Sequence, residues 1–385
     1  MKLDLFLQMM VDEGASDLFI TAGVVPSLKV HGTVERVGDE ALSPEQARAM
    51  IYAIMNEAQQ REFEASRECN FALQKPVLGR FRVNVFQHQN NIGMVMRRIE
   101  TAIPTFAELR LPALLEDLSM TKRGLVLVVG ATGTGKSSTL AAMIGHRNRN
   151  DSGHILCIED PIEFVHTPAS CIITQREVGI DTDSFESALK NALRQAPDVV
   201  LVGEIRSREA MEHAIAFSET GHLCVATLHA SNAAQTLDRI VHLFPRDRRD
   251  HLLLDMSLNL KAIVAQRLVP RADGNGRRVA MEVLLNTPLA ADLIHRGDTH
   301  LLKDLMKRSA ELGMRTFDHA VHELYNQGEI NYEDALLHAD SPNEVRLMVK
   351  LGKNGDPRAL SAGVDRVGLV RKQDEEPTLT HVKPN

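Results

Sequence analysis

A glycine-rich segment in the first half of the chain has the residue types needed to bind the phosphates of a nucleotide. It fits the pattern G-x-x-x-x-G-K-[ST], and the residues expected at the nucleotide are Gly130, Ala131, Thr132, Gly133, Thr134, Gly135, Lys136, Ser137 and Ser138. Glycines let the backbone point successive N–H groups at phosphate oxygens, and a following helix adds its dipole. Lys136 is expected to reach the β- and γ-phosphates, and the Ser137 hydroxyl to bind Mg²⁺. The motif therefore predicts binding of ATP or GTP with Mg²⁺.

The residues on both sides of this motif support that interpretation. Leu125 to Val129 has the length and β-branching of a buried parallel strand, and good helix formers follow from Ser138. The alternative is a glycine turn that joins a strand to a helix without binding phosphate. The strand–loop–helix context favours the phosphate site.

Acidic residues follow two later apolar segments. His154 to Ile158 leads into a stretch that ends at Glu163, and Asp198 to Gly203 leads into Glu204. Strands that alternate with helices predict a parallel sheet with helices on both faces and ligands at the carboxyl ends of its strands. These acids could cap helices, but behind a P-loop they are better suited to Mg²⁺ and the attacking water. The sequence leaves open whether Glu163 or Glu204 is the base.

Histidines and arginines provide further candidates. His222 and His229 flank the apolar segment Leu223 to Leu228, where they are either structural or able to sense the γ-phosphate. Arg80, Arg82 and Arg97 lie in a strand-forming region at residues 79–99. Arginines on strands are ordinarily solvated, so the residue pattern alone does not assign them a catalytic role.

Composition indicates a two-domain protein of 385 residues with a sizeable core, since 44% of its residues are hydrophobic. A net charge of −7 gives no chain-wide basic footprint for nucleic acid, and the chain has no Trp. No apolar segment reaches membrane length, and Asp4 interrupts any signal-peptide pattern. Four cysteines without a C-x-x-C pair are expected to be reduced thiols. We therefore expect a soluble, cytoplasmic protein with neither nucleic-acid binding nor membrane insertion.

The chain divides into an α+β region at residues 1–100, a linker at 101–112, an α/β domain at 113–351 and a disordered tail at 352–385. In the first region, Leu3 to Glu13 has helical periodicity, and Asp17 to Ala22 and Ser27 to Val37 alternate as strands do. Ser43 and Gln46 form a capping box for a helix that extends to about Met55. The tail combines turn formers with mixed charge and lacks apolar clusters long enough for a core.

Four segments together resemble a known family. GATGTGKS, IEDPIEFVH, PDVVLVGEIR and TGHLCVATLHA resemble, in order and spacing, the Walker A, Asp box, Walker B and His box of secretion ATPases. The N-terminal segments ASDLFITAG and RFRVNVF also look like this family. The resemblance covers approximately residues 1–340 and is greatest to the PilT/PilU-type type IV pilus retraction ATPases.

This resemblance implies a PAS-like N-terminal domain and a RecA-like P-loop ATPase domain. It also implies a homo-hexameric motor that hydrolyses ATP with Mg²⁺, in the cytoplasm at the inner-membrane pilus base, beside a platform protein and a PilT-like paralogue. By motif, Glu163 matches the proposed catalytic glutamate, Glu204 the Walker B residue that supports Mg²⁺, and His222 and His229 the His box. Arg80, Arg82 and Arg97 lie in the region that supplies arginines to the nucleotide in this family.

Two departures resemble the PilU branch of the family. The segment LAADLI at Leu289 to Ile294 stands where PilT-like proteins have an AIRNLI-type helix, and the chain continues past the usual PilT end. An accessory retraction motor is therefore the main hypothesis. An ATP-binding structural partner with slow turnover and a nucleic-acid translocase are the alternatives, and charge and the lack of a recognisable binding module disfavour the translocase.

Overall fold

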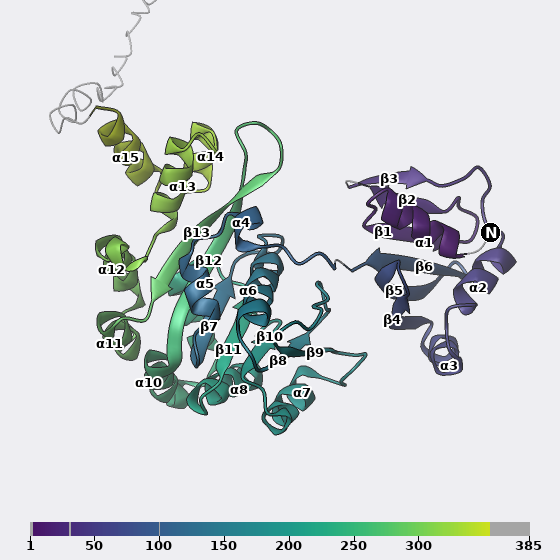
Figure 1. Ribbon diagram of the computed structural model, residues 1–385, viewed down its shortest axis with the longest axis horizontal. Helices are drawn as coiled ribbons and strands as arrows, with labels where there is room; N and C mark the ends of the chain where they lie inside the picture. Colours follow the sequence, from purple (N-terminus) through teal and green to yellow (C-terminus); the bar gives the residue numbers. More distant parts are fainter. Residues whose placement is uncertain (1–2, 31, 100, 355–385) are drawn as a thin grey trace, which may run out of the picture.

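The computed structural model describes residues 3–30, 32–99 and 101–354, which build two separate β-sheets, each with its own helices (Figure 1). The strands of the first sheet lie within residues 17–98 and those of the second within residues 124–285. Most of the segment predicted as a tail, residues 355–385, lies outside the described residues. The last described helix, α15, ends at Asn354, three residues into that predicted segment.

The first sheet is antiparallel throughout and has the order β3-β2-β1-β6-β5-β4. Its strands are β1 (Asp17–Thr21), β2 (Ser27–Val30), β3 (Thr33–Arg36), β4 (Glu68–Lys75), β5 (Gly79–His88) and β6 (Asn91–Arg98). Its helices are α1 (Leu3–Asp12), α2 (Pro44–Tyr52) and α3 (Glu57–Ser66). The predicted amphipathic helix is confirmed as α1, and the predicted capping box of Ser43 and Gln46 is present on α2.

The second sheet has the order β13-β12-β7-β11-β10-β8-β9. All its neighbouring strands are parallel except β13, which pairs antiparallel with β12. The strands are β7 (Gly124–Val129), β8 (His154–Glu159), β9 (Ile172–Glu177), β10 (Val199–Val202), β11 (Leu223–Leu228), β12 (Leu260–Pro270) and β13 (Arg277–Leu285). The prediction of an α/β fold with a mostly parallel sheet is confirmed.

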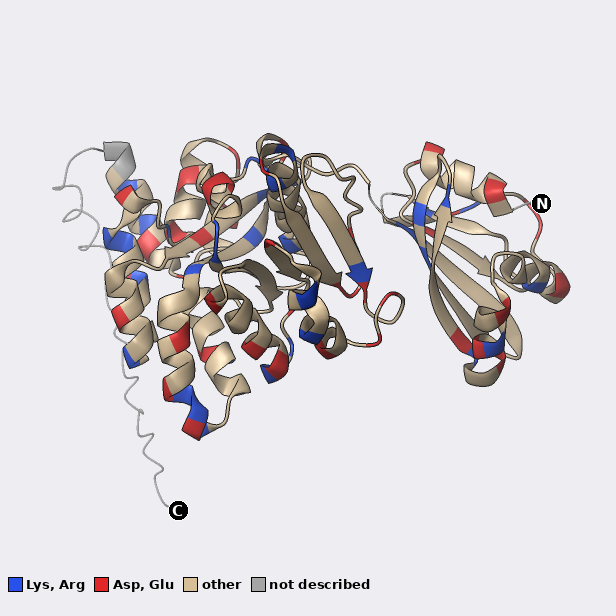
Figure 2. Cartoon of the chain, turned by 60° about the horizontal axis from the view of Figure 1, so that its bottom comes forward, with Lys and Arg blue, Asp and Glu red and all other residues tan. Residues whose placement is uncertain are grey.

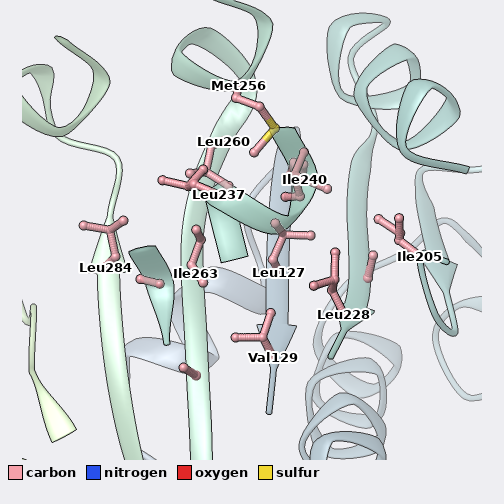
Figure 3. Close-up of a cluster of buried hydrophobic side chains, with 14 of the residues drawn as sticks. Leu127, Val129, Ile205, Leu228, Leu237, Ile240, Met256, Leu260, Ile263 and Leu284 are labelled. Atoms are coloured by element: carbon pink, nitrogen blue, oxygen red, sulfur yellow. The ribbon is translucent and has the colours of Figure 1, made fainter. Parts of the chain in front are cut away.

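Helices cover both faces of this sheet, because successive residues of a buried strand point to opposite faces. On one face, Val126 and Val128 of β7 pack in a core with α4 (Phe106–Leu109), α5 (Leu114–Ser119) and α6 (Lys136–Asn150). On the other face, Leu127 and Val129 pack in a core with helices that follow β9 in the chain, among them α8, α9 and α10 (Figure 3). The later elements are α7 (Phe185–Ala192), η1 (Leu193–Gln195), α8 (Arg208–Glu219), α9 (Ala233–Leu243), η2 (Arg246–Arg248), α10 (Arg249–Asn259), α11 (Pro288–Arg296), η3 (Thr299–Leu301), α12 (Leu302–Arg308), η4 (Ala310–Leu312), α13 (Phe317–Asn326), α14 (Tyr332–Leu337) and α15 (Pro342–Asn354).

The four cysteines are free and buried, as expected for small apolar residues in a core. No helix within the described residues is long and apolar enough to cross a membrane. Basic and acidic residues are interspersed along the helices in both parts of the molecule (Figure 2). In this view, neither part has a face of a single charge.

A buried acid joins the second sheet to the helices behind it. Glu282 on β13 is only 2% exposed and accepts a hydrogen bond from the backbone N–H of Ala233, the first residue of α9, at 2.8 Å. Burial raises the pKa of Glu282 to about 7, and Arg267 and Lys303 oppose this increase. Folding therefore places a carboxyl group where its ionised form is disfavoured.

The raised pKa of Glu282 predicts how stability varies with pH. Between pH 4.5 and about 7 the folded chain holds this proton more tightly than the unfolded chain, so the free energy of unfolding falls as pH rises through that window. Glu282→Gln keeps an acceptor for Ala233 and has no charge to bury. We expect the variant to gain roughly 1–3 kcal/mol over wild type at pH 8 and much less at pH 5. Thermal unfolding at both pH values measures this, with exposed Glu333→Gln on α14 as control, and a pH-independent difference would contradict it.

Candidate nucleotide-hydrolysis site

The predicted phosphate-binding loop connects β7 to α6 at the carboxyl edge of the second sheet. Gly130 has φ +156°, and a Cβ there would lie 2.7 Å from the backbone oxygen of Gln266, so no side chain fits. Gly135, at the N-cap of α6, has φ +85° in the left-handed region. These two glycines allow the tight turn that the motif predicts, and the loop opens onto the N-terminus of a 15-residue helix.

Lys136 is the first residue of α6 and folds back over the loop. Its Nζ donates to the backbone oxygens of Gly130 and Ala131, at 2.9 Å each. Burial lowers the pKa of Lys136, while the nearby carboxylates of Glu204 and Glu163 oppose this decrease. The lysine charge thus lies between the loop and both predicted acids.

The predicted acids meet at the same edge because their strands run parallel. Register pairs Val202 of β10 with Ile158 of β8 and with Ala226 of β11, so the residues following each strand are neighbours. Glu204 Oε1 lies 3.1 Å from His229 Nε2, and Glu204 Oε2 accepts from Arg206 Nε at 2.9 Å. The structure therefore joins Glu204 to His229 through a direct side-chain contact.

Arg206 also connects two of the predicted motifs. Its Nη1 lies 3.5 Å from Asp160 Oδ2, while its Nη2 lies 2.8 Å from Glu204 Oε2. The guanidinium thus bridges the segment that carries Glu163 and the segment that carries Glu204. Arg206 is not among the residues predicted from the sequence, and its place two residues after Glu204 is the signal that could identify it.

A cavity of 520 Å³ lies over this edge of the sheet, within the size range of small-molecule sites. Its lining includes loop residues Thr132, Gly133, Gly135, Lys136, Ser137 and Ser138 together with Glu159, Glu163, Glu204 and His229. Leu268 and Arg277, from the β12–β13 hairpin, also line it. The cavity thus combines a phosphate-binding loop with carboxylates and an apolar wall.

A second support for the loop comes from Gln266 on β12. Its side chain is buried, and its Nε2 donates to the backbone oxygen of Thr134 at 2.8 Å. Nothing in the local sequence around Gln266 marks this role. The contact depends on the parallel pairing of β12 with β7, which joins residues 132 positions apart.

The donor set fits a hydrated Mg²⁺. Ser137 offers a hydroxyl oxygen and Glu204 a carboxylate on the wall of one cavity, and Mg²⁺ usually combines one or two protein oxygens with phosphates and waters. Both Glu204 oxygens already contact His229 or Arg206, which favours contact with the ion through water. In the described residues, no group of three or more His, Cys, Asp or Glu could cage a metal ion.

The structure does not bring His222 to this site. His222 precedes β11, its backbone oxygen accepts from Gly124 N at the start of β7, and its Nδ1 lies 3.1 Å from the backbone oxygen of Phe217. A six-residue strand separates it from the P-loop edge, a span of about 20 Å. The two histidines predicted together therefore lie at opposite ends of β11, and only His229 lines the cavity.

The three predicted arginines have different surroundings. Arg80 Nη2 lies 3.8 Å from Glu177 Oε2 at the end of β9. Burial raises the pKa of Glu177, and Arg80 and Arg82 both lie near enough to oppose this increase. Arg97 Nε instead donates to Asp17 Oδ1 at 2.7 Å within the first sheet, where Asp17 lies directly opposite it. Arg80 and Arg82 thus face the second sheet, whereas Arg97 forms an ion pair in its own sheet.

Comparison with known proteins agrees with this geometry. Residues 2–330 match the family model "Type II/IV secretion system protein". The chain belongs to this family. It is 61% identical to the type IV pilus ATPase PilU of Pseudomonas aeruginosa over 97% of this chain and 98% of that protein. The predicted resemblance to PilT/PilU-type pilus ATPases is therefore confirmed.

Two further members are similar over most of their length. The type IV pilus retraction ATPase PilT of Pseudomonas aeruginosa is 40% identical over 86% of this chain and 96% of that protein. A crystal structure of the pilus retraction motor PilT with bound ADP has a TM-score of 0.84 and 37% identity, covering 90% of this chain and 99% of that one. The chain is accordingly a P-loop ATPase of the secretion ATPase family.

The surroundings of Arg97 predict a stability effect that can be separated from catalysis. The Asp17 side chain is 4% exposed, so Arg97→Ala leaves a buried carboxylate without its cation and should destabilise the chain by roughly 1–2 kcal/mol. Thermal unfolding measures this, and Arg36→Ala on exposed β3 is the control. Asp17→Asn should restore much of the lost stability in the double variant. If stability returns but turnover stays low, Arg97 acts at the nucleotide as the family resemblance implies.

Proposed function

We propose that this chain is an ATP-hydrolysing motor subunit that powers or assists type IV pilus retraction and twitching motility, as an accessory to a PilT-like motor. The 61% identity to PilU over almost the whole chain supports the pilus assignment. The observation that carries the hydrolysis mechanism is the meeting of Lys136, Glu163, Glu204 and His229 on one cavity. Hydrolysis needs this combination of phosphate binding, a carboxylate near water and an ion site.

We assign the following roles. The backbone N–H groups of residues 130–138 bind the phosphates, and Lys136 stabilises charge on the β- and γ-phosphates. Ser137 would hold Mg²⁺ directly and Glu204 would hold it through water, and the ion would offset phosphate charge. Glu163 orients and deprotonates the attacking water, because Glu204 is already bound to Arg206 and His229 whereas Glu163 is exposed in the cavity.

We infer a homo-hexamer that works at the inner-membrane base of the pilus, together with a PilT-like paralogue and a platform protein. Arg80 and Arg82 already point from the first sheet toward Glu177, which supports a role for this surface at the nucleotide. A guanidinium there would stabilise charge that develops on the γ-phosphate.

Two substitutions separate binding from chemistry. Lys136→Ala should weaken binding of a fluorescent ATP analogue by at least about tenfold, because it removes a charge-assisted hydrogen bond to phosphate. Glu163→Gln should retain binding and lose roughly 100-fold or more in kcat, since the amide keeps shape without basicity. The controls are Lys190→Ala on α7 and Glu333→Gln on α14, both exposed. Normal turnover in Lys136→Ala, or lost binding in Glu163→Gln, would contradict these roles.

The motor proposal is tested by mass and activity measured on one sample. With ATP and Mg²⁺, the purified chain should have six times the monomer mass and should hydrolyse ATP. Adding a PilT-like partner should then raise retraction in a pilus assay only when Lys136 and Glu163 are intact in this chain. If the Glu163→Gln variant supports retraction as well as wild type, the chain serves as a structural partner and the motor assignment is wrong.

A further inference from the structure

The strand β9 lies at one edge of the second sheet, next to the segment that carries Glu163. It pairs in parallel with β8, with Gln175 opposite Cys157 and Glu177 opposite Glu159. The chain leaves β8 at Glu159, passes through Glu163 and then crosses back to begin β9, which runs in the same direction as β8. We call residues 159–166 the acidic loop. Because side chains alternate along a strand, Gln175 and Glu177 are on the same face of β9.

The side chain of Gln175 contacts the acidic loop at three places. Its Nε2 donates to Glu159 Oε1 at 3.0 Å and to the backbone oxygen of Phe164 at 2.8 Å. Its Oε1 accepts from the backbone N–H of His166 at 2.9 Å. These contacts lie on both sides of Glu163, at loop positions 159, 164 and 166.

The chemistry of these partners requires an amide. Glu159 and the Phe164 carbonyl are acceptors, whereas the His166 N–H is a donor, so the partner must offer two donors and one acceptor. Glutamine has both in one planar group, and the two acceptors fix which way it is turned. A carboxylate would face two acceptors with no donor, and an apolar side chain would leave all three groups unsatisfied.

The loop that Gln175 holds is also tied to the rest of the site. Arg206 lies between Asp160 of the acidic loop and Glu204, so displacement of the loop would also disturb that ion pair. Glu159 is half-buried at the cavity wall. Burial raises the pKa of Glu159 to about 7, and the hydrogen bonds from Gln175 and from the Glu163 backbone oppose this increase by stabilising the charged form. Glu163 itself is exposed to the cavity, and the segments on both sides of it are anchored.

We propose that Gln175 is a positioning residue that holds the acidic loop so that the Glu163 carboxylate faces the transferring phosphate. The inference rests on the proposed function, in which Glu163 activates water. Gln175 does not touch nucleotide in this assignment. It acts on the rate by fixing the backbone on both sides of the catalytic group, because small displacements of such a group are costly.

The first test uses Gln175→Met, which keeps side-chain length and removes every hydrogen bond. In the full chain with ATP and Mg²⁺, we expect kcat to fall about 10- to 100-fold, while KM and the affinity for a fluorescent ADP analogue change less than about threefold. Thr174→Val is the control. It lies on the same strand, points to the other face and loses a contact to His154 Nε2 at 2.9 Å without touching the acidic loop.

The second test uses Gln175→Glu and a pH profile. At high pH the new carboxylate faces Glu159 and the Phe164 carbonyl without a donor, whereas a proton shared by the two carboxyl groups at lower pH restores one hydrogen bond. The other charged groups in this region are Glu163 on the loop, Glu177 on β9, Asp181 after it, and Arg80 and Arg82 on β5. His166 is neutral over this range, because burial lowers its pKa to about 4. The kcat of Gln175→Glu relative to wild type should rise as pH falls from 8 to 6.

The outcomes separate this inference from the proposed function. Normal turnover in Glu163→Gln would overturn the catalytic role of Glu163 and the positioning role with it. An inactive Glu163→Gln beside a fully active Gln175→Met would overturn only the role of Gln175. If Gln175→Met and Thr174→Val lose the same factor in kcat and the same number of degrees in melting temperature, the role of Gln175 is only structural. If Gln175→Met does not fold, the pH ratio of Gln175→Glu decides, and a flat ratio overturns the inference.

Discussion

Parallel pairing of fully buried strands is the constraint on which the rest of this structure depends. All six residues of β7 and all six of β11 are buried, so their backbone N–H and C=O groups have no access to water and must pair with neighbouring strands. The resulting register aligns β8, β10, β11 and β7 in one direction. The P-loop, Glu163, Glu204 and His229, which follow β7, β8, β10 and β11, then lie at one edge of the sheet. Loss of this pairing would remove the fold and the site together.

Features encoded in contiguous residues could be predicted from the sequence. The P-loop, the capping box at Ser43 and the apolar faces of α1 depend on neighbours within about four positions, where backbone geometry is nearly local. The position of Glu163 and Glu204 at one edge was also predictable, because carboxyl ends of parallel strands coincide. His222 shows the limit of that reasoning, since each strand has two ends and the structure places His222 at the end of β11 that is away from the P-loop.

Contacts between distant segments were not accessible in the same way. Arg97 faces Asp17 because β1 pairs with β6, and these residues are 80 positions apart. Gln266 reaches Thr134 across 132 positions in sequence, through the β12–β7 pair. Glutamine is a common residue, and no fixed spacing to other residues marks a functional one in the sequence. Only the pairing of strands in three dimensions distinguishes Gln266 from an ordinary surface glutamine. Residues that support the site from distant strands are therefore harder to predict than the motif residues that line it.

The contact between Arg80 and Glu177 has a consequence for movement between the two sheets. Glu177 is 2% exposed, and burial raises its pKa while Arg80 and Arg82 oppose that increase. If the first sheet moved away, Glu177 would lose both guanidinium charges, and its carboxylate would have to take up a proton or become hydrated. Contact between the two sheets is therefore linked to the protonation of one side chain.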